Sequence, residues 1–223
     1  PRVGRGPAAL GGRHRGFAVN GVDDEPSASM IDVAFALQGT VLPREHRRAL
    51  AAALEAKLPW LADQQHAWLH RINVSEGCGA LALLSGRSRL MLRVARERAA
   101  ELDALVGAEL TIAGHALRLG PPRVRELVPH TTLYSHLVAA GDASEVGFLD
   151  AMTAELAVLD VPCRCICGRQ QAAEGGTLRG FSLMLDGLSR SASLRILESG
   201  LGAERRFGCG IFVPHKSAAA VGA

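Results

Sequence analysis

The chain has 223 residues, of which 48% are hydrophobic and 21% charged, and its formal net charge is +3. This composition is typical of a globular protein and excludes a disordered chain, and the length allows one large domain or two small ones. No apolar run reaches the roughly 18 residues of a membrane span, and no apolar signal-peptide core follows the start. The odd number of cysteines, 5, does not suggest a secreted disulfide framework, so we expect a soluble cytoplasmic protein.

Arginine dominates the 25 basic residues, because only Lys57 and Lys216 are lysines. Arginine binds phosphate through its planar guanidinium and also stacks on bases. A GC-rich genome favours arginine codons as well, so the composition permits a nucleic-acid partner without arguing for one.

Residues 1–29 differ from the rest of the chain, because they are rich in Gly, Pro and Arg and show little apolar periodicity. This predicts a flexible N-terminal tail, or upstream translation before a start at Met30. From residue 31 the pattern becomes regular, and the first half predicts the order β-α-β-β-α-β. The strands are expected at 31–37, 68–74, 80–84 and 89–94, a hairpin at 109–112 and 116–119, and the helices from Pro43 to Pro59 and at about 95–105.

The order repeats after Pro121 and Pro122, which mark a natural joint. An extended segment is expected at 124–138, helices at 144–159 and 188–199, and strands at 163–167, 178–185 and 207–213. Two βαββαβ halves predict an α+β protein with two tandem ferredoxin-like domains, 30–120 and 121–216, followed by a tail at 217–223.

The sharpest motif lies near the C-terminus, where Gly200, Gly202, Gly208 and Gly210 flank two arginines, Arg205 and Arg206. Glycine lets backbone N–H groups approach an anion closely, and the arginines add positive charge at the same place. An ordinary turn with a bulged strand explains one or two of these glycines. The spacing is neither that of a Walker loop nor that of a dinucleotide fingerprint, so ATP and NAD are not implied.

A ferredoxin-like tandem ending in Gly-x-Gly-x5-Gly-x-Gly resembles the RAMP superfamily of CRISPR-associated proteins, and within it the endoribonuclease that cuts CRISPR repeat transcripts. The ending at 207–216 is similar to the variant associated with myxobacterial and cyanobacterial type I systems, and the resemblance covers about residues 31–216. It implies cleavage without metal or cofactor: the 2′-OH attacks the scissile phosphate and leaves a 2′,3′-cyclic phosphate. The implied partners are CRISPR repeat RNA and other effector-complex subunits, with no membrane.

Such a reaction needs groups that move protons near neutral pH, for which histidine is suited. The resemblance places a catalytic histidine in the first helix, where His46 matches by position. The partial positive charge and free N–H groups at that helix start favour a phosphate. His70 is the second candidate, and Tyr134, the only tyrosine of the chain, is the third. The alternatives are a surface histidine at a helix start, a half-buried strand residue and simple packing.

Positive charge and glycines predict the RNA contacts. The predicted RNA-binding residues are Gly200, Gly202, Arg205, Arg206, Gly208, Gly210, His215, Lys216, Arg87 and Arg89. A solvated charged face is the alternative for the arginines.

The three cysteines Cys163, Cys165 and Cys167 alternate along a predicted strand, which is poor geometry for one metal ion, so we expect buried thiols and no metal site. Three hypotheses stay open. They are an endoribonuclease that matures CRISPR RNA, a non-catalytic RAMP-type RNA-binding subunit, and a ferredoxin-like enzyme or regulator that uses the cysteines or a small ligand.

Overall fold

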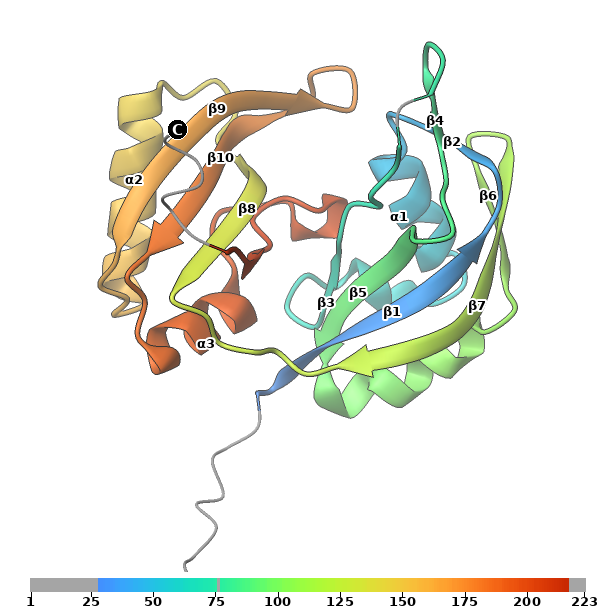
Figure 1. Ribbon diagram of the computed structural model, residues 1–223, viewed down its shortest axis with the longest axis horizontal. Helices are drawn as coiled ribbons and strands as arrows, with labels where there is room; N and C mark the ends of the chain where they lie inside the picture. The colour runs from blue at the N-terminus through green and yellow to red at the C-terminus, as the bar shows by residue number, and fades with distance from the viewer. Residues whose placement is uncertain (1–27, 76, 217–223) are drawn as a thin grey trace, which may run out of the picture.

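The computed structural model describes residues 28–75 and 77–216. It is a mixed α/β protein with two large antiparallel sheets and a small two-stranded sheet, and Figure 1 shows the two large sheets in separate halves of the molecule. The tails predicted at 1–29 and 217–223 lie outside the described residues except for 28 and 29. Ser29 already belongs to the fold, because its backbone N–H and its hydroxyl donate to Glu198. Within the described ranges, no helix has the length and apolar character needed to cross a membrane.

The N-terminal half contains a five-stranded sheet in the order β3-β5-β1-β7-β6. Its strands are β1 (Met30–Gln38), β3 (Ala67–Leu69), β5 (Arg89–Ala95), β6 (Glu109–Ile112) and β7 (His115–Arg125). The helices are α1 (Arg47–Glu55) and the 3-10 helices η1 (Pro59–Ala62) and η2 (Arg96–Leu105). The two remaining strands, β2 (Val41–Pro43) and β4 (Leu81–Leu83), pair with each other outside this sheet.

Two expectations for this half were wrong in detail. The first helix begins at Arg47 rather than at Pro43, because Pro43 pairs with Leu81 as the last residue of β2. The run at 68–74 forms only the short strand β3, because the hydrogen bonds of the β3–β5 ladder end near residue 70.

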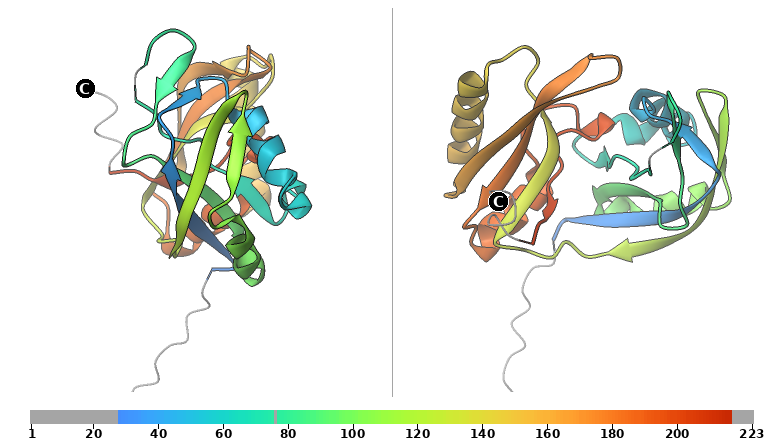
Figure 2. Two further views of the ribbon diagram at one scale, coloured as in Figure 1. Left: turned by 90° about the vertical axis from the view of Figure 1, so that its right-hand side faces the viewer. Right: turned by 45° about the horizontal axis from the view of Figure 1, so that its top comes forward.

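The C-terminal half contains a four-stranded sheet in the order β11-β8-β10-β9. Its strands are β8 (Thr132–Ala139), β9 (Arg164–Ala173), β10 (Leu178–Asp186) and β11 (Val213–Pro214), and its helices are α2 (Glu145–Val158), α3 (Arg190–Ser199) and η3 (Arg205–Phe207). Side-chain caps define where α2 and α3 start, because Ser144 accepts from the Gly147 N–H and Ser189 from the Ala192 N–H. Figure 2 shows the two halves side by side with the chain passing from β7 into β8.

Two further expectations were wrong. The extended segment at 124–138 is interrupted between Arg125 and Thr132, and Pro129 lies in the interruption. The predicted last strand at 207–213 is mostly irregular, because Gly208 and Gly210 take positive φ angles of 76° and 67°, which break a strand.

Each large sheet carries helices on one face, and the cores lie there. In the N-terminal half, Val33 and Phe35 of β1 pack with Leu50 of α1 and Leu102 of η2. The core of the C-terminal half also includes Trp68, a residue of β3, so apolar contacts join the two halves.

A buried ion pair lies where the halves meet. Arg93 of β5, only 1% exposed, donates from Nε and Nη2 to the two carboxylate oxygens of Asp32 on β1, at 2.7 and 3.0 Å. Its Nη1 donates to the carbonyl oxygens of Leu197 in α3 and of Phe212, at 2.9 and 3.0 Å. A single side chain of the N-terminal half therefore satisfies backbone groups of the C-terminal half.

Replacing Asp32 with alanine should lower the free energy of unfolding by about 3–5 kcal/mol, because Arg93 would stay buried without its partner. Burial alone would raise the pKa of Asp32, but contacts with His70 and Arg93 hold it well below its ordinary value. The stability difference is therefore fully present above the unfolded-state pKa of about 3.9 and shrinks as the pH falls below it. Urea unfolding at several pH values measures this.

The matched control is Glu126→Gln, which removes an exposed partner of Arg96 and should change the stability little. An Asp32→Ala protein as stable as this control would contradict the role of the pair.

Candidate active site between the two sheets

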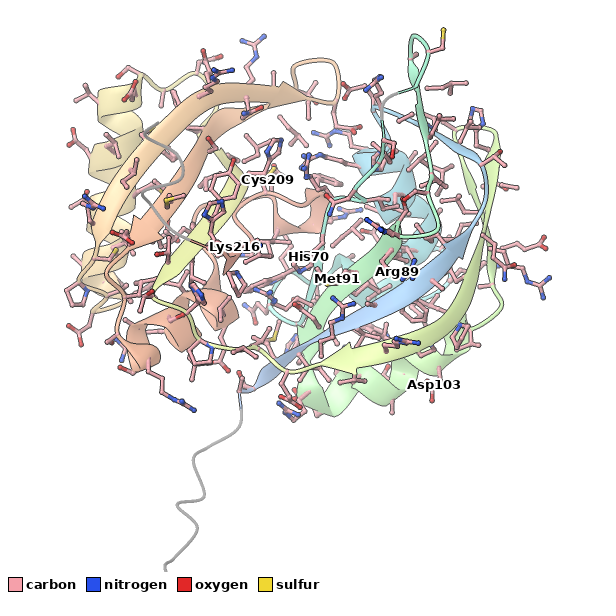
Figure 3. The ribbon with its side chains drawn as sticks, viewed as in Figure 1. His70, Arg89, Met91, Asp103, Cys209 and Lys216 are labelled. Atoms are coloured by element: carbon pink, nitrogen blue, oxygen red, sulfur yellow. The ribbon has the colours of Figure 1, made fainter. Side chains whose placement is uncertain are left out.

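A pocket of about 230 Å³, called the central pocket below, lies between the two halves. It is lined by His70, Arg71, Asn73, Met91, Tyr134, His136, Gly208, Ile211 and Val213. Figure 3 shows His70 and Met91 near the boundary between the halves. Two histidines, an arginine and a tyrosine thus come together from both sheets, and none of the described residues that line this pocket is acidic.

His70 directly follows β3 and lies beside the buried pair of Asp32 and Arg93. Its Nε2 lies 3.5 Å from the Asp32 carboxylate, close enough for an electrostatic contact but without a well-formed hydrogen bond. Burial lowers the pKa of His70, and the nearby Arg93 lowers it further against the opposing effect of Asp32. His70 is therefore a neutral imidazole at neutral pH, oriented by a carboxylate.

His136 on β8 is the second histidine of the central pocket. Partial burial and the positive charges of Arg71 and Arg47 lower its pKa to about 4. Burial and the charge of Arg47 also lower the pKa of Arg71, whose side chain makes no hydrogen bond or ion pair to the described residues. The positive charges gathered here would favour the binding of an anion.

His46 lies beside this pocket rather than in its lining. It is the N-cap of α1 and is 4% exposed. Its Nδ1–H donates to the carbonyl oxygen of Pro43 at 2.7 Å, so the lone pair is on Nε2, which is buried without a hydrogen-bond partner. Burial lowers the pKa of His46. The next residue, Arg47, links it to the pocket, because Arg47 Nη1 donates to the carbonyl oxygen of Gly208 at 3.2 Å.

The helix start that was expected to attract a phosphate already holds a carboxylate. Glu174, in the turn between β9 and β10, accepts from the backbone N–H groups of Arg47 and Arg48 at 2.8 and 3.4 Å. The negative charge of Glu174 is favourable at this end of α1. The C-terminal half therefore contacts the first turn of α1 beside His46.

Tyr134 on β8 is half-buried and lines the central pocket, while its catalytic role stays a prediction. Its ring centroid is 5.6 Å from that of His215, at an interplanar angle of 51°. His215 is held by its own backbone N–H, which donates to the Thr132 carbonyl oxygen at 3.0 Å. Lys216 follows at the exposed surface, and Figure 3 places it beside β8.

The glycine-rich segment 200–210 passes between the halves, where η3 contacts α1 and β3 (Figure 1). All four predicted glycines have positive φ, and three of them approach backbone atoms closely. A Cβ at Gly210 would lie 2.0 Å from the Leu201 carbonyl oxygen, and one at Gly200 would lie 2.6 Å from the Gly210 carbonyl oxygen. A Cβ at Gly208 would lie 3.0 Å from the Leu69 carbonyl oxygen, and the N–H of Gly202 donates to Glu155. Packing thus explains these glycines, while their contact with RNA stays a prediction.

The two arginines of this segment also have partners within the chain. Arg206 pairs with Glu55 of α1. The guanidinium of Arg205 lies 5.3 Å from the centre of the Trp68 ring, and burial lowers its pKa. Both side chains join the halves together, and neither is placed in the central pocket.

Arg87 and Arg89 lie apart from the central pocket, around the turn that leads into β5. Both are exposed. The Nη1 of Arg89 donates to the carbonyl oxygens of Gly86 and Ser88 at 2.8 and 2.7 Å, which fixes the side chain against the turn. Arg89 is the first residue of β5, and Figure 3 places it on the side of Met91 away from His70.

Sequence reasoning did not select His136, Arg71 and Arg47 as site residues. The signal for His136 was its strand alternation with Tyr134, which does place both side chains in one pocket. Arg71 and Arg47 each follow a candidate histidine, but their proximity to one another is a tertiary feature that the spacing does not show.

The three cysteines at 163–167 lie elsewhere: Cys163 directly precedes β9, and Cys165 and Cys167 belong to it. All three are half-buried rather than buried as expected. Cys163 and Cys165 line a separate pocket of about 450 Å³ beside α2, and all three pack against the core of the C-terminal half. The interaction with Cys163 lowers the pKa of Cys165 to about 7. Among the described residues, no group of three His, Cys, Asp or Glu side chains is arranged to hold a metal ion.

The Cas6 family model, described as Cas6 Crispr, matches residues 31–217. The CRISPR-associated endonuclease Cas6 of Myxococcus xanthus is 36% identical over 194 residues, which cover 86% of this chain and 84% of the relative. The chain belongs to the Cas6 family, which confirms the resemblance found in the sequence.

Solved structures agree on the fold. A CRISPR-associated Cas6 protein aligns with a TM-score of 0.60 at 11% identity, over 84% of this chain and 100% of that one. A Cas6-related protein from Pyrococcus furiosus aligns with a TM-score of 0.55 at 12% identity, over 82% of this chain and 98% of that one.

Gly210→Ala should destabilise the protein more than Gly187→Ala. Both residues have positive φ, which costs an alanine about 1–2 kcal/mol. A Cβ at Gly187 meets nothing within 4 Å, whereas one at Gly210 clashes with the Leu201 carbonyl oxygen. Chemical unfolding of both variants measures the difference. Equal losses of stability would show that close packing is not what requires glycine at 210.

Proposed function

We propose that this protein is an endoribonuclease that cleaves CRISPR precursor transcripts within their repeats and so produces mature guide RNAs. The observation that carries the proposal is the central pocket, where His70, Arg71 and His136 meet in a chain of the Cas6 family and where the described lining residues include no acidic side chain. A phosphodiester is an anion that such a pocket can neutralise, and the imidazoles beside it can move protons.

The strand orders support two tandem ferredoxin-like domains, 30–120 and 121–216. Four strands of the first sheet lie side by side in the order β7-β1-β5-β3. Numbered by their order along the chain, they are strands four, one, three and two of a βαββαβ unit, and β6 is added at the edge beside β7. The second sheet, β11-β8-β10-β9, has the same arrangement. Each half thus has the antiparallel sheet expected of a βαββαβ unit.

In the proposed reaction, the 2′-oxygen attacks the scissile phosphorus and the bond to the 5′-oxygen breaks. The products are a 2′,3′-cyclic phosphate and a 5′-hydroxyl. We assign one proton transfer to His46, because its Nε2 carries a lone pair and has no partner. His70, oriented by Asp32, is the second proton-transfer group, and Arg71 with Arg47 would stabilise the charge on the phosphate.

Exposed arginines extend from the central pocket along the N-terminal sheet. Ala34 of β1 lies opposite Met91 of β5 on one side and opposite Arg123 of β7 on the other. Arg125 of β7 lies opposite Asp32 of β1 in the next row on the same face. These residues share the face that α1 and η2 leave uncovered, because the neighbouring Val33 and Phe35 pack in the helix-covered core. Arg123 and Arg125 make no ion pair with the described residues. They would bind RNA phosphates together with the predicted Arg87, Arg89, His215 and Lys216.

We further propose that the protein keeps its product and joins other subunits of an effector complex. The alternative of a non-catalytic RNA-binding subunit shares the fold and the positive charge. Cleavage assays distinguish this alternative from a nuclease, because a non-catalytic subunit would bind repeat RNA without cutting it.

His46→Ala should lower the rate of repeat-RNA cleavage by about 10²–10⁴-fold, because a proton-transfer group is lost. The dissociation constant for uncleaved RNA should stay nearly unchanged. As the pH rises and His46 loses its proton, kcat/KM should increase. Because burial lowers the pKa of His46, the midpoint of this increase should lie below pH 6.5. Single-turnover cleavage and filter binding measure these quantities.

The matched control is His115→Ala, in the β6–β7 hairpin, which should cleave like the parent protein. Full cleavage by the His46→Ala protein would contradict the assignment and leave His70 as the remaining candidate for proton transfer.

EDTA should leave cleavage intact, because the proposed proton transfers use imidazoles and the charge is stabilised by arginines. Cleavage of end-labelled repeat RNA with and without EDTA, followed by phosphatase treatment of the product ends, measures both metal dependence and end chemistry. A strict requirement for added Mg²⁺ or Zn²⁺ would contradict the mechanism.

A further inference from the structure

A second pocket, of about 560 Å³, lies on the C-terminal sheet and shares Tyr134 with the central pocket. Its lining includes Ile166, Gly168, Arg169, Ser182 and Met184. The volume is within the range of roughly 300–1,000 Å³ that small-ligand sites occupy. We call it the sheet pocket.

The floor of the sheet pocket is an apolar row across three strands. Tyr134 of β8 is directly opposite Met184 of β10, and Met184 is directly opposite Ile166 of β9. Residues directly opposite in antiparallel strands project from the same face. The neighbours Leu183 and Leu185 pack in the helix-covered core, so this row belongs to the face without helices.

Polar groups border this apolar row. A Cβ at Gly168 would lie 2.2 Å from the Ser182 hydroxyl oxygen, so glycine leaves that hydroxyl room at the pocket. Arg169 and Gln171 also line the pocket, and their side chains make no hydrogen bond or ion pair to the described residues. Met184 is buried, and Tyr134 and Ile166 beside it are half-buried. An aromatic ring next to apolar side chains, with a few unused hydrogen-bonding groups, suits a nucleobase.

The charge of the two pockets differs. The central pocket has arginine and histidine without an acidic residue in its described lining, whereas Glu145 and Arg169 both line the sheet pocket. The first therefore favours a phosphate and the second a neutral group. Because both pockets share Tyr134, one RNA strand could place a phosphate in the first and an adjoining base in the second.

We propose that the sheet pocket binds an unpaired base of the nucleotide next to the scissile phosphate and that Tyr134 stacks on this base. Tyr134 then selects and positions the RNA and transfers no proton. This inference rests on the proposed RNA-processing function, and it gives the hydroxyl and the ring of Tyr134 separate tests.

The first test compares Tyr134→Phe with Tyr134→Leu. Phenylalanine keeps the ring, so the affinity of this variant for a non-cleavable 2′-deoxy repeat RNA should be close to that of the parent protein. Leucine removes the ring and should weaken binding of a non-cleavable 2′-deoxy repeat RNA by about 5- to 150-fold, the range for one stacked base. Loss of cleavage in Tyr134→Phe with unchanged binding would instead make the hydroxyl a proton-transfer group and overturn the proposal.

The second test removes bases from the RNA. Each unpaired position of the repeat is replaced by an abasic nucleotide, and binding to the parent protein and to Tyr134→Leu is measured. One position should weaken binding to the parent protein and have little further effect on the variant. Additive losses at every position would show that no base stacks on Tyr134.

A third variant tests the floor independently. Ile166→Glu places a charge in the sheet pocket and should weaken binding, whereas Val158→Glu, on an exposed position of α2, should not. Equal binding by the two would overturn the proposal. Because these are binding measurements, absence of cleavage by the parent protein would refute the proposed nuclease function without deciding the base site.

Discussion

Arg93 holds the two halves of the chain together, and the candidate active site depends on their relative position. Its guanidinium is saturated by the Asp32 carboxylate and by two carbonyl oxygens of the C-terminal half. A buried cation needs such partners, because an unpaired charge in the interior is strongly unfavourable. The same Asp32 lies beside His70, so the interaction that joins the halves also orients a histidine of the central pocket.

The order of the main elements was predictable because short stretches of sequence indicate where each helix and strand lies. Ser144 and Ser189 mark the starts of α2 and α3, and apolar periodicity marks the strands. The error at 207–213 has the same origin. Its apolar residues favour a strand, but Gly208 and Gly210 take positive φ where they pack closely against other backbone. Gly208 contacts Leu69, which is distant in the sequence, and Gly210 contacts Leu201 of the same segment.

The candidate site was predictable in part. His70 and Tyr134 do meet in one pocket, although they come from different halves. Their meeting with His136 and Arg71 depends on the contact between the halves, which no spacing shows. The glycine-rich segment was found correctly as an unusual feature. Its glycine pattern indicates a backbone with positive φ angles and close contacts. A phosphate-binding loop and a segment packed tightly between two halves of a protein have the same pattern.

Two carboxylates accept from backbone N–H groups that the sequence suggested as anion sites. Glu174 accepts from the first N–H groups of α1, and Glu155 accepts from the N–H of Gly202. Both N–H sites expected to attract phosphate are therefore satisfied within the chain, and a phosphate there would have to displace a carboxylate. In the central pocket it displaces none, and it would offset the charges of Arg47 and Arg71, which together with burial hold the pKa of His136 to about 4. Binding there would raise the pKa of His136, so an RNA phosphate would itself favour the protonated form of this imidazole.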